Sequence, residues 1–214
     1  MSEVELGVGS ARLSGFLEVP ADARGVVAFA HGSGSSRLSP RNLAVARALN
    51  ARGIATLLFD LLTSEEEADR RNVFDIGLLS SRLSAAVVWL QQHEETSGLG
   101  VGLFGASTGA AAALVSAAEL GEAVAAVVSR GGRPDLAGDA LEQVRAPTLL
   151  IVGGSDVVVL ELNREAASRL RCEYALEVVP GATHLFEEPG ALERVCELAT
   201  EWFVRHLGAA GLSP

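Results

Sequence analysis

Short apolar runs that end in small or polar residues recur along the chain after Gly25. Runs that are apolar at every position are typical of strands buried on both faces, as in a parallel sheet. Between them lie segments whose apolar residues repeat with the period of a helix. The runs read VVAFAHG, ATLLFD, VGLFG, AVVS, TLLIVGG and YALEVVP, and the helical segments span 43–51, 76–93, 107–119, 160–170 and 192–207. This alternation predicts right-handed crossovers and a mostly parallel central sheet with helices on both faces.

The beginning of the chain follows a different pattern. Two short segments, 4–8 and 11–19, are joined by the turn residues Gly9 and Ser10, and we expect them to form an antiparallel hairpin. The sequence contains neither an internal repeat nor an interdomain linker, so we expect a single α/β domain over residues 1–214. The charge-dense segment 64–71 is expected to be a solvated surface connection.

Composition and charge narrow the class of partner. The chain has 214 residues, 49% of them hydrophobic, and a formal net charge of −10, which argues against a basic nucleic-acid-binding face. No apolar run is long enough to span a membrane, and the first residues lack the pattern of a secretory signal. Cys172 and Cys196 lack the spacing of a metal site or disulfide framework. We therefore expect a cytoplasmic protein that acts on a small molecule, without a metal or cofactor.

One serine lies at the hinge between a predicted strand and a predicted helix. Gly105, Ser107 and Gly109 form a G-x-S-x-G pattern in the segment LFGASTGAAAA. This pattern is typical of a sharp strand-to-helix turn that exposes a nucleophilic hydroxyl beside a helix N-terminus. The alternative is a serine that only caps the helix. A catalytic role requires a general base and an orienting acid elsewhere in the chain.

Two further residues follow apolar runs and supply those partners. His184 lies in GATHLFEE and Asp156 in LLIVGGSD, so both are expected beyond the carboxyl ends of strands, where open α/β sheets bind ligands. The chain order Ser107, Asp156, His184 is the order of α/β-hydrolases. Asp60 also follows an apolar run but precedes the serine, and we expect it to cap a helix or pair with an arginine.

Acyl transfer also requires N–H donors for the developing oxyanion. We expect one donor to be the backbone N–H of Thr108, and the other to be the N–H of Ser33 in the turn HGSGSS, with Gly34 as the alternative. His31 is expected to brace this turn by hydrogen bonds rather than to transfer protons. The remaining histidines, expected at or near the surface, are His93 and His206.

Five segments together resemble the dienelactone hydrolase-like group of α/β-hydrolases. They are HGSGSSRLSPRN, GASTGAAAAL, SRGGRPDLA, LLIVGGSD and GATHLFEEPG, and the resemblance spans about residues 25–207. It implies an α/β-hydrolase fold in which the nucleophile, acid and base map onto Ser107, Asp156 and His184. Dienelactone hydrolases proper carry cysteine as the nucleophile. The serine in this chain favours ester hydrolysis over the lactone activity that names the group.

The size of the loops bears on the substrate. The intervals 61–72 and 128–148 are too short for a large cap domain, so we expect an open site that takes small or medium esters.

Arginines follow two of the predicted strands on the same side of the sheet. Arg37 and Arg130 are candidates for binding a carboxylate or phosphate of the substrate. The alternative, which we favour from sequence, is that the arginines here pair with acidic neighbours. The arginines are Arg37, Arg41, Arg130 and Arg133, and the acidic neighbours include Asp135 and residues 65–67.

Together these features predict a serine hydrolase that cleaves carboxylic esters or lactones through an acyl-enzyme. Two other functions fit the same residues. One is an acyltransferase or thioesterase that uses the same triad with another acceptor or acyl donor. The other is a noncatalytic small-molecule receptor built on this fold.

Overall fold

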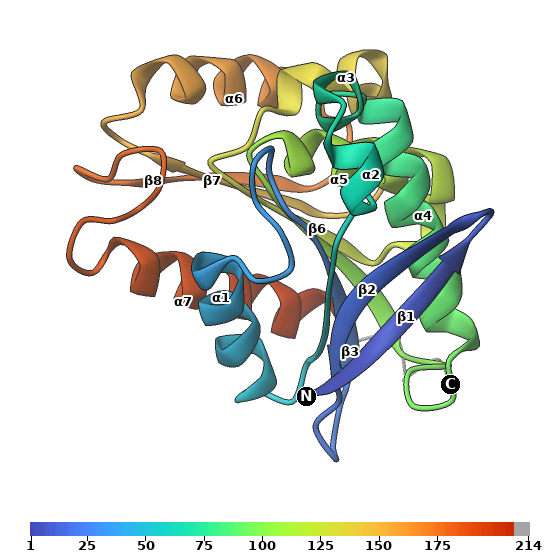
Figure 1. The fold of residues 1–214 in the computed structure, drawn as a ribbon. Coiled ribbons are helices and arrows are strands. Elements are labelled where there is room, and N and C mark those ends of the chain that lie inside the picture. Colours follow the sequence, from blue (N-terminus) through green and yellow to red (C-terminus); the bar gives the residue numbers. More distant parts are fainter. Residues whose placement is uncertain (208–214) are drawn as a thin grey trace.

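A twisted sheet of eight strands runs through the described part of the chain, residues 1–207, with helices on both of its faces (Figure 1). The structure is a computed structural model. The strands are β1 (Ser2–Val8), β2 (Ala11–Glu18), β3 (Gly25–Ala30), β4 (Ala55–Phe59), β5 (Gly100–Ala106), β6 (Ala126–Arg130), β7 (Thr148–Gly153) and β8 (Tyr174–Val179). Their order in the sheet is β1-β2-β4-β3-β5-β6-β7-β8. Strand β2 pairs antiparallel with β1 and β4, and the pairs from β4 to β8 are parallel.

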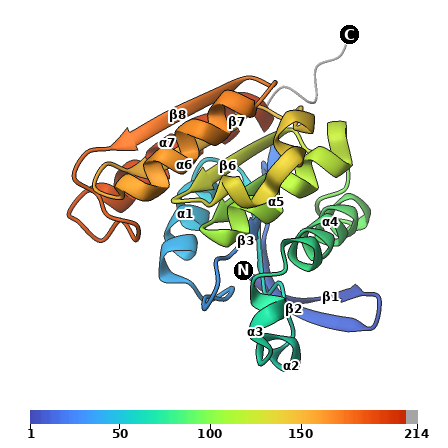
Figure 2. The same cartoon turned by 90° about the horizontal axis from the view of Figure 1, so that it is seen from above.

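Two layers of helices bury the two faces of this sheet (Figures 1 and 2). The α-helices are α1 (Pro40–Asn50), α2 (Ser64–Glu67), α3 (Arg70–Val73), α4 (Ile76–Gln92), α5 (Thr108–Leu120), α6 (Val157–Arg169) and α7 (Ala191–Leu207). Two 3₁₀ segments, η1 (Gly121–Ala123) and η2 (Pro134–Gln143), flank β6. Helices α4, α5 and α6 share one apolar core with the sheet, whereas α1 and α7 share the core on the opposite face.

The observed elements follow the predicted pattern closely. Strands β3, β4, β6 and β7 are buried at every position, as expected for runs that are apolar throughout. The antiparallel hairpin at the beginning of the chain is confirmed. Helix α1 begins earlier than predicted, because Ser39 caps it and Pro40 occupies its first turn.

Residues 64–71 lie at the surface, as expected, but they are not an irregular loop. This segment forms α2 and begins α3, two helices of four residues each. Thr63 and Glu66 form a reciprocal capping box at the start of α2, and Glu66 also pairs with Arg82 of α4. Helices this short carry no apolar stripe of helical period, so the hydrophobic pattern of the sequence does not reveal them.

No large cap covers the carboxyl edge of the sheet in the described residues. Between β4 and α4 the chain forms only α2, α3 and their connections, and between β6 and β7 it forms η2. None of the helices in residues 1–207 is long and apolar enough to cross a lipid bilayer.

Candidate active site

Ser107 lies on a strained turn between β5 and α5. Its backbone has a φ of 51° and a ψ of −121°. In the described chain, Ser107 and Phe186 are the two non-glycine residues with a positive φ. Such a conformation costs about 1–3 kcal/mol and persists only where the surroundings hold it. Here the Ser107 carbonyl accepts the N–H groups of Ala110 and Arg133, while its own N–H donates to the Arg130 carbonyl.

The glycines on either side of Ser107 are required by space. A Cβ atom on Gly105 would lie 2.4 Å from Ala110 Cα, and one on Gly109 would lie 2.2 Å from the carbonyl oxygen of Ala30. Both distances are far below van der Waals contact with backbone atoms that cannot move independently. The turn is therefore packed against the end of β3 and the first turn of α5, as the G-x-S-x-G pattern predicts.

The hydroxyl of Ser107 does not cap its helix. Ser107 occupies the N-cap position of α5, yet its side chain makes no capping hydrogen bond within the described structure. A serine that served only as a cap would accept an N–H from the first turn of the helix. The geometry therefore speaks against the capping interpretation and leaves the hydroxyl available for chemistry.

His184 and Asp156 are brought together by the loops that follow β8 and β7. Nδ1 of His184 lies 2.7 Å from Oδ2 of Asp156. The two loops approach closely because Gly153 has no side chain: a Cβ there would lie 2.3 Å from the carbonyl oxygen of Ala182. With Nδ1 donating to the carboxylate, Nε2 of His184 is the ring nitrogen left to accept a proton.

Ser107 and His184 line the same cavity, which has a volume of about 220 Å³. Within residues 1–207 no hydrogen bond joins the Ser107 hydroxyl to the imidazole. Catalytic hydrogen bonds are often long before substrate binds, so a shared cavity is the relevant observation. The other lining residues are Gly32, Ser33, Ser35, Ser39, Arg41, Asn42, Ala106, Arg130 and Leu185.

The two residues predicted to donate to an oxyanion are in direct contact. Thr108 is the first residue of α5, so its backbone N–H has no acceptor within the helix. The N–H of Ser33 donates to Thr108 Oγ1 at a distance of 3.0 Å. In this state the Ser33 donor is therefore engaged by the hydroxyl of its predicted partner. Gly34, the alternative donor, lies next to it with a φ of 68°.

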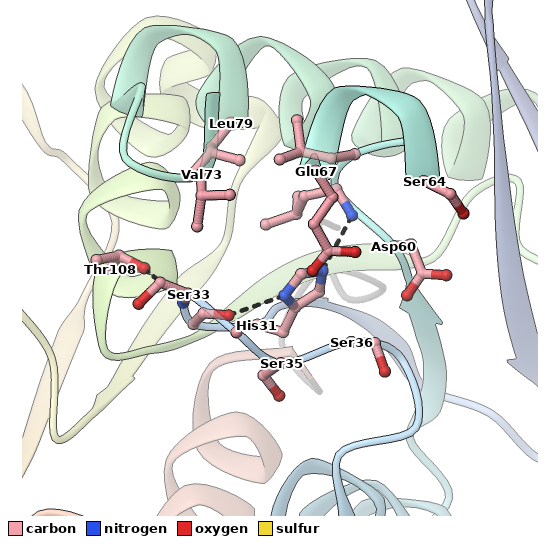
Figure 3. A pocket seen from close by; sticks show the side chains of 14 residues that line it. His31, Ser33, Ser35, Ser36, Asp60, Ser64, Glu67, Val73, Leu79 and Thr108 are labelled. Atoms are coloured by element: carbon pink, nitrogen blue, oxygen red, sulfur yellow. Dashed lines mark hydrogen bonds between the residues drawn. The ribbon is translucent and has the colours of Figure 1, made fainter. Parts of the chain in front are cut away.

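His31 braces the turn that carries Ser33, as predicted. Its Nδ1 donates to the Gly32 carbonyl and its Nε2 accepts the N–H of Leu61, each at 3.1 Å (Figure 3). Burial lowers the pKa of His31 below its ordinary value, which keeps the ring neutral at pH 7. Both ring nitrogens are occupied by backbone groups, so this histidine is not available as a general base.

A second, smaller cavity of about 70 Å³ lies beside the same turn (Figure 3). Ser33 and Thr108 line it as well, so their hydrogen bond lies between the two cavities. Val73 and Leu79 give it an apolar wall, and Glu67 lies on the side of α2.

The arginines divide into paired and unpaired groups. Arg37 donates its backbone N–H to Asp60, and its guanidinium forms an ion pair with the same carboxylate outside the Ser107 cavity. Asp60 thus pairs with an arginine, as expected. Arg133 pairs with Asp135 through two hydrogen bonds from its guanidinium. Arg130 differs, because it lines the Ser107 cavity and has no acidic partner among the described residues.

The remaining histidines and the cysteines are not among the residues that line the Ser107 cavity. His93 stacks on Trp89, and His206 packs beside Trp202. Both cysteines are half-buried free thiols whose pKa is raised by burial, so they are poor nucleophiles. In residues 1–207 no group of three or more His, Cys, Asp or Glu side chains is arranged to hold a metal ion.

Comparison with known proteins assigns the chain to a family. The sequence model of the dienelactone hydrolase family matches residues 13–207. The chain belongs to the dienelactone hydrolase family. A crystal structure of the dienelactone hydrolase from Anabaena variabilis ATCC 29413 is 56% identical, with a TM-score of 0.94 over 96% of this chain and 97% of that one. Est1E from Butyrivibrio proteoclasticus is 16% identical and shares the fold, with a TM-score of 0.83 over 96% and 99% of the two chains.

Two curated relatives of this dienelactone hydrolase family member are longer proteins. They come from two strains of Mycobacterium tuberculosis, and each is named "Putative phosphoribosyl transferase". Each is 60% identical over 211 residues, which are 99% of this chain but 48% of the relative. The chain therefore spans about half the length of these relatives.

Proposed function

We propose that the protein is a serine hydrolase that cleaves small or medium carboxylic esters or lactones through an acyl-enzyme. Ser107 is the nucleophile, His184 the general base and Asp156 the acid that orients the imidazole. One observation carries the proposal: a strained serine with an uncommitted hydroxyl shares a cavity with an imidazole whose Nδ1 is held by a carboxylate.

The first half of the reaction forms the acyl-enzyme. Nε2 of His184 accepts the proton of the Ser107 hydroxyl while Oγ attacks the ester carbonyl carbon. Asp156 holds the imidazole in the correct tautomer and stabilises its positive charge. The imidazolium then donates its proton to the departing alkoxide, which leaves as the alcohol.

The second half returns the enzyme to its starting state. A water molecule gives a proton to Nε2 of His184 and attacks the acyl carbon, and the imidazolium then returns a proton to Ser107 Oγ as the carboxylic acid leaves. Acyl transfer would differ only in replacing this water with an alcohol or a thiol. The open rim, with His184 39% exposed, favours water as the acceptor because solvent reaches the ring directly.

The oxyanion that forms in both halves requires donors already in place. The N–H of Thr108 is the first donor, and the N–H of Ser33 is the second. Because Ser33 now donates to Thr108 Oγ1, it becomes available once that hydroxyl rotates away about χ1. Each such donor contributes about 3–4 kcal/mol to the transition state in related chemistry.

The other candidate functions have less support. A noncatalytic receptor has no need for backbone strain at Ser107 or for the His184–Asp156 pair. The transferase name of the longer relatives is not proposed for this chain, because the chain spans only about half of them and its cavity holds the groups of a serine hydrolase.

Covalent labelling with a fluorophosphonate probe tests this proposal. The wild-type protein should be labelled at neutral pH, with the adduct on the peptide that contains Ser107, and Ser107→Ala should not be labelled. Ser97→Ala is the matched control, because Ser97 is exposed in the loop before β5 and its hydroxyl donates to the nearby Glu94 carbonyl. An unlabelled wild type, or equal labelling of wild type and Ser107→Ala, would contradict the proposal. Rates on esters of increasing acyl length then define the substrate size.

A further inference from the structure

Arg130 is a buried cation at the catalytic edge of the sheet. It is the last residue of β6 and pairs in register with Ala106, so its backbone lies beside Ser107. Its side chain points to the same face as Val128, two residues earlier, toward α1 and α7. The residue is only 7% exposed, yet it lines the cavity that holds Ser107 and His184.

The guanidinium of Arg130 lacks the partners that buried charges normally have. Among residues 1–207 its side chain makes no hydrogen bond and no ion pair, and its Nε is buried without an acceptor. Its neighbours include the ring of Phe186, 5.9 Å from the guanidinium carbon, and the charged side chain of Arg41. The thiol of Cys196 is also near, and burial raises its pKa to about 11, so it is neutral.

Arg130 remains charged despite this setting. Burial, and then the charge of Arg41, lower its pKa to about 10, which is still well above neutral pH. A buried charge without a counter-charge is costly to keep folded, and such groups are normally paired with an opposite charge. Within residues 1–207 no carboxylate forms an ion pair with Arg130.

A second arginine and a helix terminus add positive potential to the same cavity. Arg41 lies in the first turn of α1 and lines the cavity with Asn42, whose Oδ1 is buried without a partner. The only ion pair that Arg41 forms within the described chain is to the exposed carboxylate of Glu187, at a distance of 3.6 Å. Helix α1 has eleven residues, and its positive N-terminal end is at this position. The cavity is thus positive in a chain whose net charge is −10.

We propose that Arg130, together with Arg41, binds an oxyanion on the substrate. The inference rests on the proposed function, and it specifies the substrate class: esters that carry a carboxylate or phosphate a few carbons from the scissile carbonyl. The volume of about 220 Å³ limits the spacer to this length, because Ser107 and both arginines line one cavity. A guanidinium binds either oxyanion through two parallel N–H bonds. Arg37, the other candidate from sequence, is already neutralised by Asp60.

The kinetic test compares three acyl chains on the same leaving group. The substrates are 4-nitrophenyl butyrate, 4-nitrophenyl hemisuccinate and 4-nitrophenyl 3-phosphonopropanoate, with background hydrolysis measured on Ser107→Ala. For Arg130→Met, the ratio of kcat/KM between an anionic and the neutral ester should fall by about tenfold or more, mainly through KM. Arg41→Gln should lower the ratio by a smaller factor, and Arg37→Gln, the matched control, should leave it unchanged. The anionic ester whose kcat/KM ratio falls more in Arg130→Met identifies the natural group, with the phosphonate standing for a phosphate.

A binding measurement separates this inference from the proposed function. Inorganic phosphate, compared with sodium chloride at equal ionic strength, should raise the Tm of wild type and Arg37→Gln but not that of Arg130→Met. If phosphate raised the Tm as expected but no ester was hydrolysed, the hydrolase proposal would be overturned and the anion site would be supported. Hydrolysis of all three esters with the same anionic-to-neutral ratio in wild type and variants would overturn the anion site alone. If Arg130→Met does not fold, the same comparisons on Arg41→Gln decide the question.

Discussion

Replacing Asp156 with asparagine tests the central geometry of the site. The carboxylate accepts a hydrogen bond from His184 at 2.7 Å and is 16% exposed, so it should stabilise the imidazolium that forms during attack. Two unit charges at this separation attract by about 6 kcal/mol at an effective dielectric constant of about 20, which corresponds to about 10⁴ in rate. His184 is 39% exposed, and the resulting screening lowers the expected loss of kcat to about 10³-fold. An asparagine amide would also favour the wrong imidazole tautomer.

The assay is steady-state hydrolysis of a neutral 4-nitrophenyl ester. Asp60→Asn is the matched control, since Asp60 also follows a buried strand, is 20% exposed and is paired with a cation, Arg37, outside the Ser107 cavity. The kcat of Asp60→Asn should stay within a few-fold of the wild-type value. If Asp156→Asn kept kcat within about tenfold of wild type while its circular dichroism was unchanged, the assignment of Asp156 as the orienting acid would be refuted.

Two further predictions concern the scaffold around the site. Gly105→Ala would place a Cβ 2.4 Å from Ala110 Cα, so urea unfolding should show a loss of about 3 kcal/mol or more, whereas Gly7→Ala, which meets only a flexible arginine tip, should change little. An equal effect of the two substitutions would contradict the packing argument. The folded protein lowers the pKa of His31, so the unfolded chain binds the proton first and stability should fall as the pH drops below about 6.5. Urea unfolding of His31→Gln at pH 7.5 and 5.5 should show a weaker loss than wild type, and an identical loss would show that His31 does not contribute.

The sequence was sufficient to predict the sheet and the edge of it at which the three proposed catalytic residues lie. Both depend on a rule of the architecture: apolar runs become parallel strands, and their carboxyl ends lie at one edge of the sheet. Ser107, Asp156 and His184 each follow such a run, so their chain separation of tens of residues did not obscure their proximity in space.

Pairings made by side chains far apart in the chain could not be predicted in the same way. Arg37 and Arg130 look equivalent in sequence, but one is paired with Asp60 and the other is buried among α1, α7 and Phe186. The partner of each arginine depends on the face of the sheet to which its side chain points and on the helices packed against that face. The packing of those helices cannot be read from the residues next to the arginine in sequence. The bond between Ser33 and Thr108 is of the same kind, since it joins two turns 75 residues apart.

Two α-helices of the described chain begin at an N-cap residue whose side chain makes no capping hydrogen bond. Four N-cap residues accept a hydrogen bond from the first turn of their helix through the side chain: Ser39, Thr63, Asp69 and Asp75. Ser107 and Asp156 are of the same residue types and hold the same position, yet in the described structure neither makes a capping bond. Each lost cap costs about 1 kcal/mol. Serine, threonine and aspartate cap the four other helices named above, but the side chains of Ser107 and Asp156 do not cap theirs. Both residues lie at the same edge of the sheet. We infer that their side chains are kept for a purpose other than folding. The buried and unpaired Arg130, at the same edge, is explained by the same reasoning.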